Sequence, residues 1–179
     1  MRQAGAVATT ADLLVDLFGR VRERTLATLA DLTHDELAVR IDPEANTVGW
    51  LVWHLTRVQD DHVAAVAGTE QMWTAQGWVG RFELPLEPAD IGYGHTPEQV
   101  AVVRVSDPDL LAGYHEAVHA ASVRYLSGLS DADLDRVVDT SWDPPVTLGV
   151  RLVSVVDDDL EHAGQAAFLR GHLLRRRRE

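Results

Sequence analysis

Cysteine is absent from this 179-residue chain, and its absence excludes disulfides, thiolate metal sites and a cysteine nucleophile. Any thiol that the chemistry needs must therefore come from a substrate or a cofactor. Lysine is absent as well, so all 16 basic residues are arginine. No stretch approaches the roughly 18 apolar residues of a membrane span, and the N-terminus lacks the long apolar run of a signal peptide. We therefore expect a cytoplasmic protein with no membrane partner.

Positive charge is also scarce, since the formal net charge is −12. A protein this acidic is repelled by phosphate backbones, so we expect no nucleic-acid partner. The local run Arg175–Arg178 is typical of a solvated helix end, where cations complement the helix dipole. With 46% hydrophobic and 25% charged residues, the composition is that of a globular protein. The length fits a single domain over residues 1–179.

Strand signals are scarce, and the only β-branched run, residues 99–105, is expected to form a short extended piece. Four segments instead carry apolar residues at helical spacing, with capping signals at their ends. These helices are predicted within residues 9–32, 45–68, 106–128 and 147–174. Shorter capped turns are predicted within residues 33–41 and 130–139.

Four long helices predict an all-α fold, a four-helix bundle. The connection between the second and third helices, residues 69–107, is long for a compact domain, so we expect an ordered, functional loop. A connection of this length lets the second and third helices run parallel, whereas a short loop would force them antiparallel. The predicted order is therefore up-down-down-up, with a long crossover between helices 2 and 3.

The third long helix contains His115-Glu116-x-x-His119, the HExxH pattern of zinc metalloproteases. In such enzymes the two histidines hold the metal and the glutamate acts as general base. The third ligand is missing, because Tyr125 stands where a histidine is expected and the next glutamate, Glu161, is on another helix. We interpret the pattern as two histidines at the surface edge of an amphipathic helix.

A different set of residues has the spacing of a metal site. His54 belongs to a largely apolar, inward-facing stripe of the second long helix. Asp158 and His162 of the fourth helix are four residues apart, so they project side by side. If these two helices are antiparallel, as the predicted order requires, the helical rise places all three residues at one level. Three ligands leave open coordination positions, which is the form of a catalytic metal site.

The fourth helix has two apolar stripes, and periodicity leaves open which one faces the bundle centre. One stripe comprises Val153, Val156, Leu160, Ala163 and Ala167. The other, which includes the positions of Asp158 and His162, comprises Leu148, Val155, Ala166 and Leu169. If the first stripe faces the centre, Asp158 and His162 are merely surface polar residues. If the second does, the first must pack against another part of the molecule. The third helix and the 69–107 segment are candidates to cover part of it, and any exposed remainder favours a homodimer.

The segments NTVGWLVWHLTRVQDDH and DDDLEHAGQAAFLRG resemble the DinB-like superfamily, most closely its actinobacterial branch related to mycothiol-dependent maleylpyruvate isomerases. The resemblance covers nearly the whole chain, and its most specific motifs are WxxxHL at residues 50–55 and HAGQ at residues 162–165. It implies a metal-binding four-helix bundle whose first metal histidine falls on His54 and whose last falls on His162. Many members carry histidine four residues before the last ligand, and the maleylpyruvate isomerases carry glutamate, where this chain has Asp158. The HEAVH segment is not a ligand position in that family.

The resemblance implies a metal-dependent transferase or isomerase that acts on a small molecule with a low-molecular-weight thiol such as mycothiol, and with zinc or nickel as the divalent metal. Such a cation can bind the thiol sulfur and lower its pKa. Asp61, on the same stripe as His54, is the candidate catalytic residue beyond the ligands, because it can orient a ligand or a bound water. A plain charged residue near a helix end is the alternative for Asp61. Arg57 and Arg170 are candidates for an anionic substrate or for surface ion pairs.

Two other functions stay open from the sequence, which does not decide whether the chain is an enzyme. One is a non-catalytic dimeric bundle with a vestigial metal site. The other is a metal-dependent hydrolase, in which water takes the place of the thiol.

Overall fold

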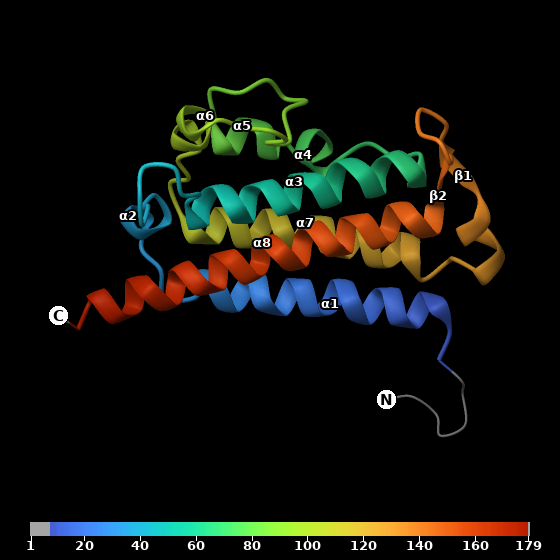
Figure 1. Ribbon diagram of the computed structural model, residues 1–179, viewed down its shortest axis with the longest axis horizontal. Coiled ribbons are helices and arrows are strands. Elements are labelled where there is room, and N and C mark those ends of the chain that lie inside the picture. The colour runs from blue at the N-terminus through green and yellow to red at the C-terminus, as the bar shows by residue number, and fades with distance from the viewer. Residues whose placement is uncertain (1–7, 179) are drawn as a thin grey trace.

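The computed structural model describes residues 8–178, and its main body is a bundle of four long helices (Figure 1). These are α1 (Thr10–Leu29), α3 (Val48–Ala67), α7 (Pro108–Leu126) and α8 (Leu148–Arg176). In Figure 1, α3 and α7 run in one direction, and α1 and α8 run in the opposite one. The predicted up-down-down-up order is therefore confirmed. The first seven residues, which enter the prediction that a signal peptide is absent, lie outside the described residues.

Each long helix begins at a polar side chain that accepts a hydrogen bond from the backbone of the first turn, as expected of an N-cap. The caps are Thr9, Thr47, Asp107 and Thr147. For α3 the sequence allowed Asn46 or Thr47, and Thr47 makes the bond. The same helix ends at Gly68, whose φ of 67° is the left-handed conformation that glycine adopts readily. Local capping chemistry thus determines where the helices begin and end.

The long crossover is ordered, as expected, and contains three short helices. They are α4 (Met72–Ala75), α5 (Trp78–Phe82) and α6 (Pro97–Val102). The prediction of an extended piece at 99–105 was wrong for its first half, which belongs to α6. Thr96 forms a reciprocal capping box with Gln99, and Pro97 stands in the first turn. These local helix-starting signals outweigh the β-branched content of the run.

The turn predicted in residues 33–41 is α2 (His34–Leu37), capped by Thr33. The turn predicted in residues 130–139 is only partly helical. A short 3-10 helix, η1 (Asp131–Asp135), is followed by β1 (Val137–Asp139), which pairs antiparallel with β2 (Val146–Thr147). This small hairpin was not predicted, because strands of two or three residues are too short to show an alternating pattern.

Helix α8 packs between α1 and α3, so both of its apolar stripes are largely covered. Leu148, Val155, Ala166 and Leu169 of the second stripe are buried. In the first stripe, Val156 packs with Phe18 of α1, and Ala163 packs with Val21 of α1. The expectation that α7 or the crossover covers this stripe was wrong, because α1 covers it. Of the first stripe, Val153 and Ala167 are exposed.

Within residues 8–178, none of the helices combines the length and the apolar character that crossing a membrane requires.

Candidate metal centre

The three predicted ligands come together between α3 and α8. One potential ligand atom from each of His54, Asp158 and His162 lies within 4.8 Å of the other two. Nε2 of His162 is 3.7 Å from Oδ1 of Asp158. This is close to the roughly 3.4 Å between two ligands of a tetrahedral cation with bonds of about 2.1 Å. The described residues contain no second group of three such side chains.

The nitrogen of His54 that faces the ligand group is selected by the crossover. Its other nitrogen, Nδ1, lies 2.5 Å from the backbone oxygen of Ile91. A carbonyl oxygen only accepts hydrogen bonds, so Nδ1 carries the proton and Nε2 presents its lone pair. Gly92 makes this approach possible, since a Cβ at that position would lie 2.8 Å from Nδ1 of His54 and 2.9 Å from the ring of Trp53.

The ring plane of His54 is held by Trp50, which is one turn earlier on α3. The two rings stack with centroids 4.6 Å apart and an interplanar angle of 16°. Trp50 Nε1 donates to Nδ1 of His95, 3.1 Å away, and Nε2 of His95 lies 3.0 Å from a carboxylate oxygen of Asp90. His95 and Asp90 both belong to the crossover. These contacts connect the crossover to a neighbour of a candidate ligand, and the functional role of the segment stays a prediction.

His162 is oriented in a similar way from its own helix. Its Nδ1 lies 3.1 Å from the side-chain oxygen of Gln165, one turn later on α8. Nδ1 therefore donates, and Nε2 remains free on the side of Asp158. Both histidines consequently offer the same kind of donor, an Nε2 lone pair whose ring is fixed by a hydrogen bond on the opposite nitrogen.

The burial and charge of the group suit a cation. Burial lowers the pKa of His54, which is therefore neutral at pH 7 and able to act as a ligand. Asp158 is one-third exposed as a side chain, yet its Oδ2 is buried and has no hydrogen-bond partner within the described residues. A buried carboxylate oxygen without a partner is costly unless a proton or a cation satisfies it. Two imidazole nitrogens and this carboxylate form a donor set typical of zinc and nickel.

The HExxH pattern of α7 does not form a comparable site. His115 is completely buried, so its assignment to the surface edge was wrong. Its Nδ1 is hydrogen-bonded to Thr56, 3.0 Å away, and burial lowers its pKa to about 3. Glu116, which would have to act as general base, is paired with Arg22 of α1. The pattern therefore serves packing between α7 and its neighbours α1 and α3.

The two arginines considered for an anionic substrate are engaged elsewhere. Arg57 is completely buried and donates to the backbone oxygen of Asp90 and the side chain of Gln71. It therefore anchors the crossover to α3 and is closed to a substrate. Arg170 donates to the backbone oxygen of Ala30 at the end of α1. None of these contacts involves a candidate metal ligand.

Asp61 lies on α3 with its side chain one-third exposed. Its Oδ1 accepts from Gln71 Nε2 at 2.7 Å, and its Oδ2 is 3.5 Å from Nδ1 of His62. These contacts tie it to the crossover and to the next residue of α3. A catalytic role for Asp61 stays a prediction.

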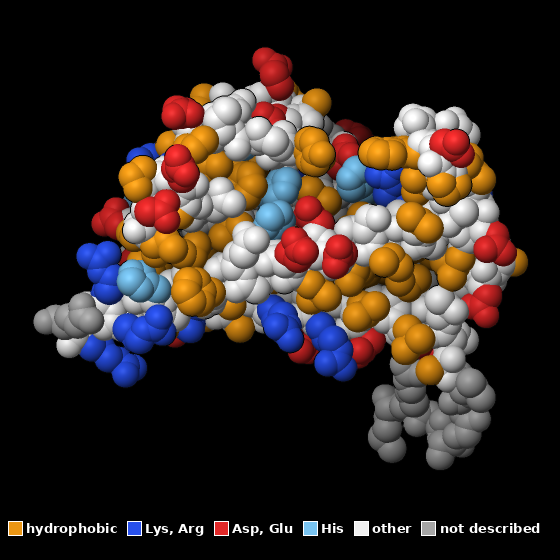
Figure 2. Space-filling model, viewed as in Figure 1, with side chains coloured by type: hydrophobic (Ala, Val, Ile, Leu, Met, Phe, Trp, Pro, Cys, Tyr) orange, Lys and Arg blue, Asp and Glu red, His pale blue; other side chains and the backbone are white. Residues whose placement is uncertain are grey.

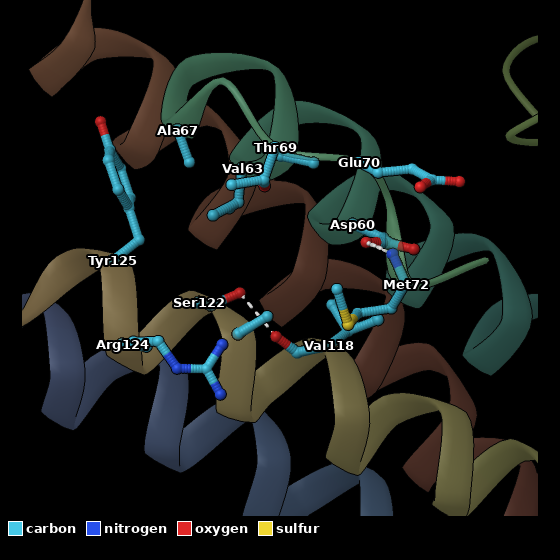
Figure 3. A pocket seen from close by; sticks show the side chains of 12 residues that line it. Asp60, Val63, Ala67, Thr69, Glu70, Met72, Val118, Ser122, Arg124 and Tyr125 are labelled. Atoms are coloured by element: carbon cyan, nitrogen blue, oxygen red, sulfur yellow. Dashed lines mark hydrogen bonds between the residues drawn. The ribbon is translucent and has the colours of Figure 1, made fainter. Parts of the chain in front are cut away.

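A cavity of about 210 Å³ lies on the other side of α3, between α3 and α7 (Figure 3). Asp60, Val118 and Tyr125 are among the residues that line it. In Figure 3, Asp60 is bonded to the backbone of Met72. None of the three candidate ligands lines this cavity, so it is separate from the candidate metal centre.

The sequence predicted the three candidate ligands that the structure brings together, but not the residues that surround them. The glycine-rich stretch DIGYGH contains Ile91, Gly92 and His95, and its glycines were the only signal of a close backbone approach. Gln165 belongs to the HAGQ motif, but the sequence did not predict its hydrogen bond with His162.

Comparison with known proteins identifies the family of the chain and a solved structure with the same fold. The profile of a family described as mycothiol-S-transferase matches residues 13–174. A conserved protein from Enterococcus faecalis, known from a crystal structure, is 35% identical, with a TM-score of 0.85 over 92% of this chain and 96% of that one. No curated protein matches. The predicted resemblance to mycothiol-dependent proteins of the DinB-like superfamily is confirmed. With 162 of its residues inside the family profile and its bundle shared with a solved relative, the chain belongs to the mycothiol-S-transferase family.

Proposed function

We propose that the protein is a metal-dependent transferase that joins a low-molecular-weight thiol to an electrophilic small molecule. The observation that carries the proposal is the meeting of two Nε2 lone pairs and an unpartnered carboxylate oxygen between α3 and α8. His54, Asp158 and His162 would hold the metal, zinc or nickel, and would leave positions open for a reactant. A divalent cation held there supplies the charge that lowers the pKa of a thiol and so provides a thiolate at neutral pH.

The chain's own residues prepare the site before any reactant arrives. Ile91 and Gln165 fix the two imidazole rings, so little conformational freedom is lost when the ligands act together. Because the chain has no cysteine, the sulfur of the reaction comes from outside. Asp61, on the same helix as His54, is proposed to orient a reactant at the site. Aspartate in place of the histidine or glutamate of relatives is shorter, but it keeps the carboxylate oxygen that the site needs.

The proposal is tested with mycothiol and monochlorobimane, a fluorogenic electrophile. The sulfur displaces chloride, so a C–S bond forms, the C–Cl bond breaks with its electron pair leaving on chloride, and the thiol proton passes to buffer. We expect adduct formation that is lost with a chelator and restored by zinc or nickel. Metal retention without thiol transfer would instead favour the hydrolase. Protein purified without bound metal and unable to take it up would favour the non-catalytic bundle.

A homodimer also stays a proposal, but its expected surface changes. Val156 and Ala163 of the first stripe are buried against α1 and cannot reach a second copy. Exposed hydrophobic residues instead occur near the start of α1, at Leu13 and Leu17, and near the start of α8, at Val150 and Val153. Figure 2 shows hydrophobic side chains gathered over the first halves of these two helices. An isologous contact through this surface is the proposed dimer.

A further inference from the structure

Two pockets of similar size flank the candidate metal centre along the seam between α3 and α8. The polar pocket has a volume of about 410 Å³, and its polar side chains are His62, Arg136, Asp139 and Arg151. The apolar pocket has a volume of about 420 Å³ and is lined mainly by hydrophobic residues, among them Ile41, Leu51, Phe168 and Leu169. None of the three candidate metal ligands lines either pocket.

The spacing along α8 places the pockets on opposite sides of the ligands. Arg151 precedes Asp158 by seven residues, so it lies on the same helical face about 10 Å away. Gln165, in the wall of the apolar pocket, accepts the hydrogen bond from His162. Figure 2 shows histidine side chains at two places along this seam, with acidic side chains nearby and a basic one beside the second place. The two pockets therefore lie on opposite sides of the candidate ligands along α8.

The polar pocket offers balanced donors and acceptors rather than an excess of one charge. Arg151 donates to Asp139 at 2.8 Å and to Nδ1 of His62 at 3.4 Å. Arg136 donates to the hydroxyl of Tyr125 at 2.9 Å and to a backbone oxygen. Asp61, 3.5 Å from His62, adds a further negative charge at the edge. An anion would meet these carboxylates, whereas hydroxyl groups, which both donate and accept, match such a mixed set.

The apolar pocket has the opposite character. Phe168 is 65% exposed and Ile41 is 48% exposed, although both are large hydrophobic residues. They share the pocket wall with Gln165, which accepts a hydrogen bond from the candidate ligand His162. Ligand pockets are typically lined by such residues, with a few polar groups to fix orientation.

We propose that this seam orients the two reactants in opposite directions. The neutral, polyhydroxylated body of the thiol occupies the polar pocket, and the apolar part of the electrophile occupies the apolar pocket. The two reactive atoms then meet at the centre. This inference rests on the proposed function, and it fits mycothiol, whose thiol is carried on a sugar.

A pair of variants separates the two pockets in the mycothiol–bimane assay. Arg136→Gln removes donors from the polar pocket and is expected to raise KM for mycothiol about fivefold, as the loss of a hydrogen bond does, with KM for the bimane unchanged. Phe168→Ala is expected to do the reverse. Arg136→Lys, which keeps the charge and one donor, should recover part of the loss. Arg124→Gln, an exposed arginine on α7 with the same change in charge, should alter neither KM.

Binding to metal-stripped protein gives a readout that does not depend on catalysis. Methyl N-acetylglucosaminide is expected to shift backbone amide NMR signals of residues 62–66 and 136–139, and toluene those of residues 41–46 and 164–169. Absence of metal uptake would overturn the proposed function and leave this result intact. Both probes binding in one pocket, the reverse assignment, or Phe168→Ala turning a dimer into a monomer would overturn the orientation.

Discussion

At the scale of single residues, the candidate centre depends on atoms that lie outside the ligand set. Ile91 contributes only a backbone oxygen, and Gly92 contributes only the absence of a side chain. Contacts of this kind commonly change metal affinity by about 10–100-fold when they are altered. The sequence indicates the candidate ligands because histidine and aspartate are recognisable by type and spacing. It does not show the contact from Ile91, because every residue has a carbonyl.

Replacing His162 with alanine is expected to abolish metal retention, since two ligands remain where three are needed. The helical circular dichroism should be largely unchanged, because the residue lies at the partly exposed edge of α8. His119→Ala is the matched control, since it removes a histidine from α7 that is not part of the group. Metal analysis of the purified proteins distinguishes the two positions. Loss of metal from His119→Ala alone would restore the metalloprotease interpretation.

Gly92→Ala is expected to weaken metal binding at least tenfold, because the new methyl group would lie against His54 and force the ring or the loop to move. Gly94→Ala is the control. It has a similar left-handed backbone, with φ of 69° against 88°, and nothing within 4 Å of the added Cβ. Alanine at either position strains the backbone, at a cost of about 1 kcal/mol. Only alanine at position 92 also places its methyl group too close to His54. Equal zinc affinity in a competition titration would contradict the role assigned to Gly92.

The buried His115 makes stability depend on pH. Burial lowers its pKa to about 3 from an ordinary value of 6.5, so between these values the unfolded chain binds the proton and the folded chain does not. The free energy of unfolding is therefore unaffected by protonation of His115 above pH 6.5. Below that pH it falls by about 1.4 kcal/mol per pH unit as the pH drops toward 3. Urea unfolding at pH 7, 6 and 5 measures this slope. His115→Gln should flatten it, and an unchanged slope would mean that other groups dominate.

At the scale of elements, local signals predicted the four long helices and their caps, while tertiary contacts determined the rest. The two apolar stripes of α8 did not indicate which of them faces the bundle centre. Both are needed, because a helix packed between α1 and α3 requires a wide apolar arc. The β-branched run at 99–105 predicted an extended piece, but the capping box at Thr96 starts a helix that includes the first half of the run. The hairpin of β1 and β2 was invisible in the pattern. The crossover was expected to be functional, but its contact with His54 depends on how it folds back.

The attachment of the crossover to α3 is a second element-scale feature that can be tested. Arg57 is completely buried, lies 3.7 Å from Asp60 and contacts the ring of Trp73. Arg57→Met removes one member of a buried pair, and such changes typically cost about 3–5 kcal/mol. We expect this loss in urea unfolding, together with faster amide exchange in residues 88–92. Arg170→Gln, at a partly exposed arginine, should cost far less, and similar losses in both would refute the anchoring role.

At the scale of the whole molecule, the exposed hydrophobic surface over the starts of α1 and α8 predicts self-association. Light scattering is expected to give twice the chain mass of 19.7 kDa. Val153→Asp, at a residue that is 64% exposed, should produce a monomer, because it places a charge in the proposed contact. Val102→Asp introduces the same charge on α6 and should leave the dimer intact. A monomer at high micromolar concentration in the unmodified protein would exclude the contact.

The parallel course of α3 and α7 sets a minimum length for the chain between them. Helix α3 has 20 residues, so the chain must return about 30 Å before α7 can begin, which about nine extended residues accomplish. The segment between Ala67 and Pro108 is several times longer. The surplus is what folds over His54. An engineered shortcut between the two helices is therefore expected to preserve the topology and to remove the backbone contact that orients His54, so the bundle and the orientation of its candidate ligand are separable features of one chain.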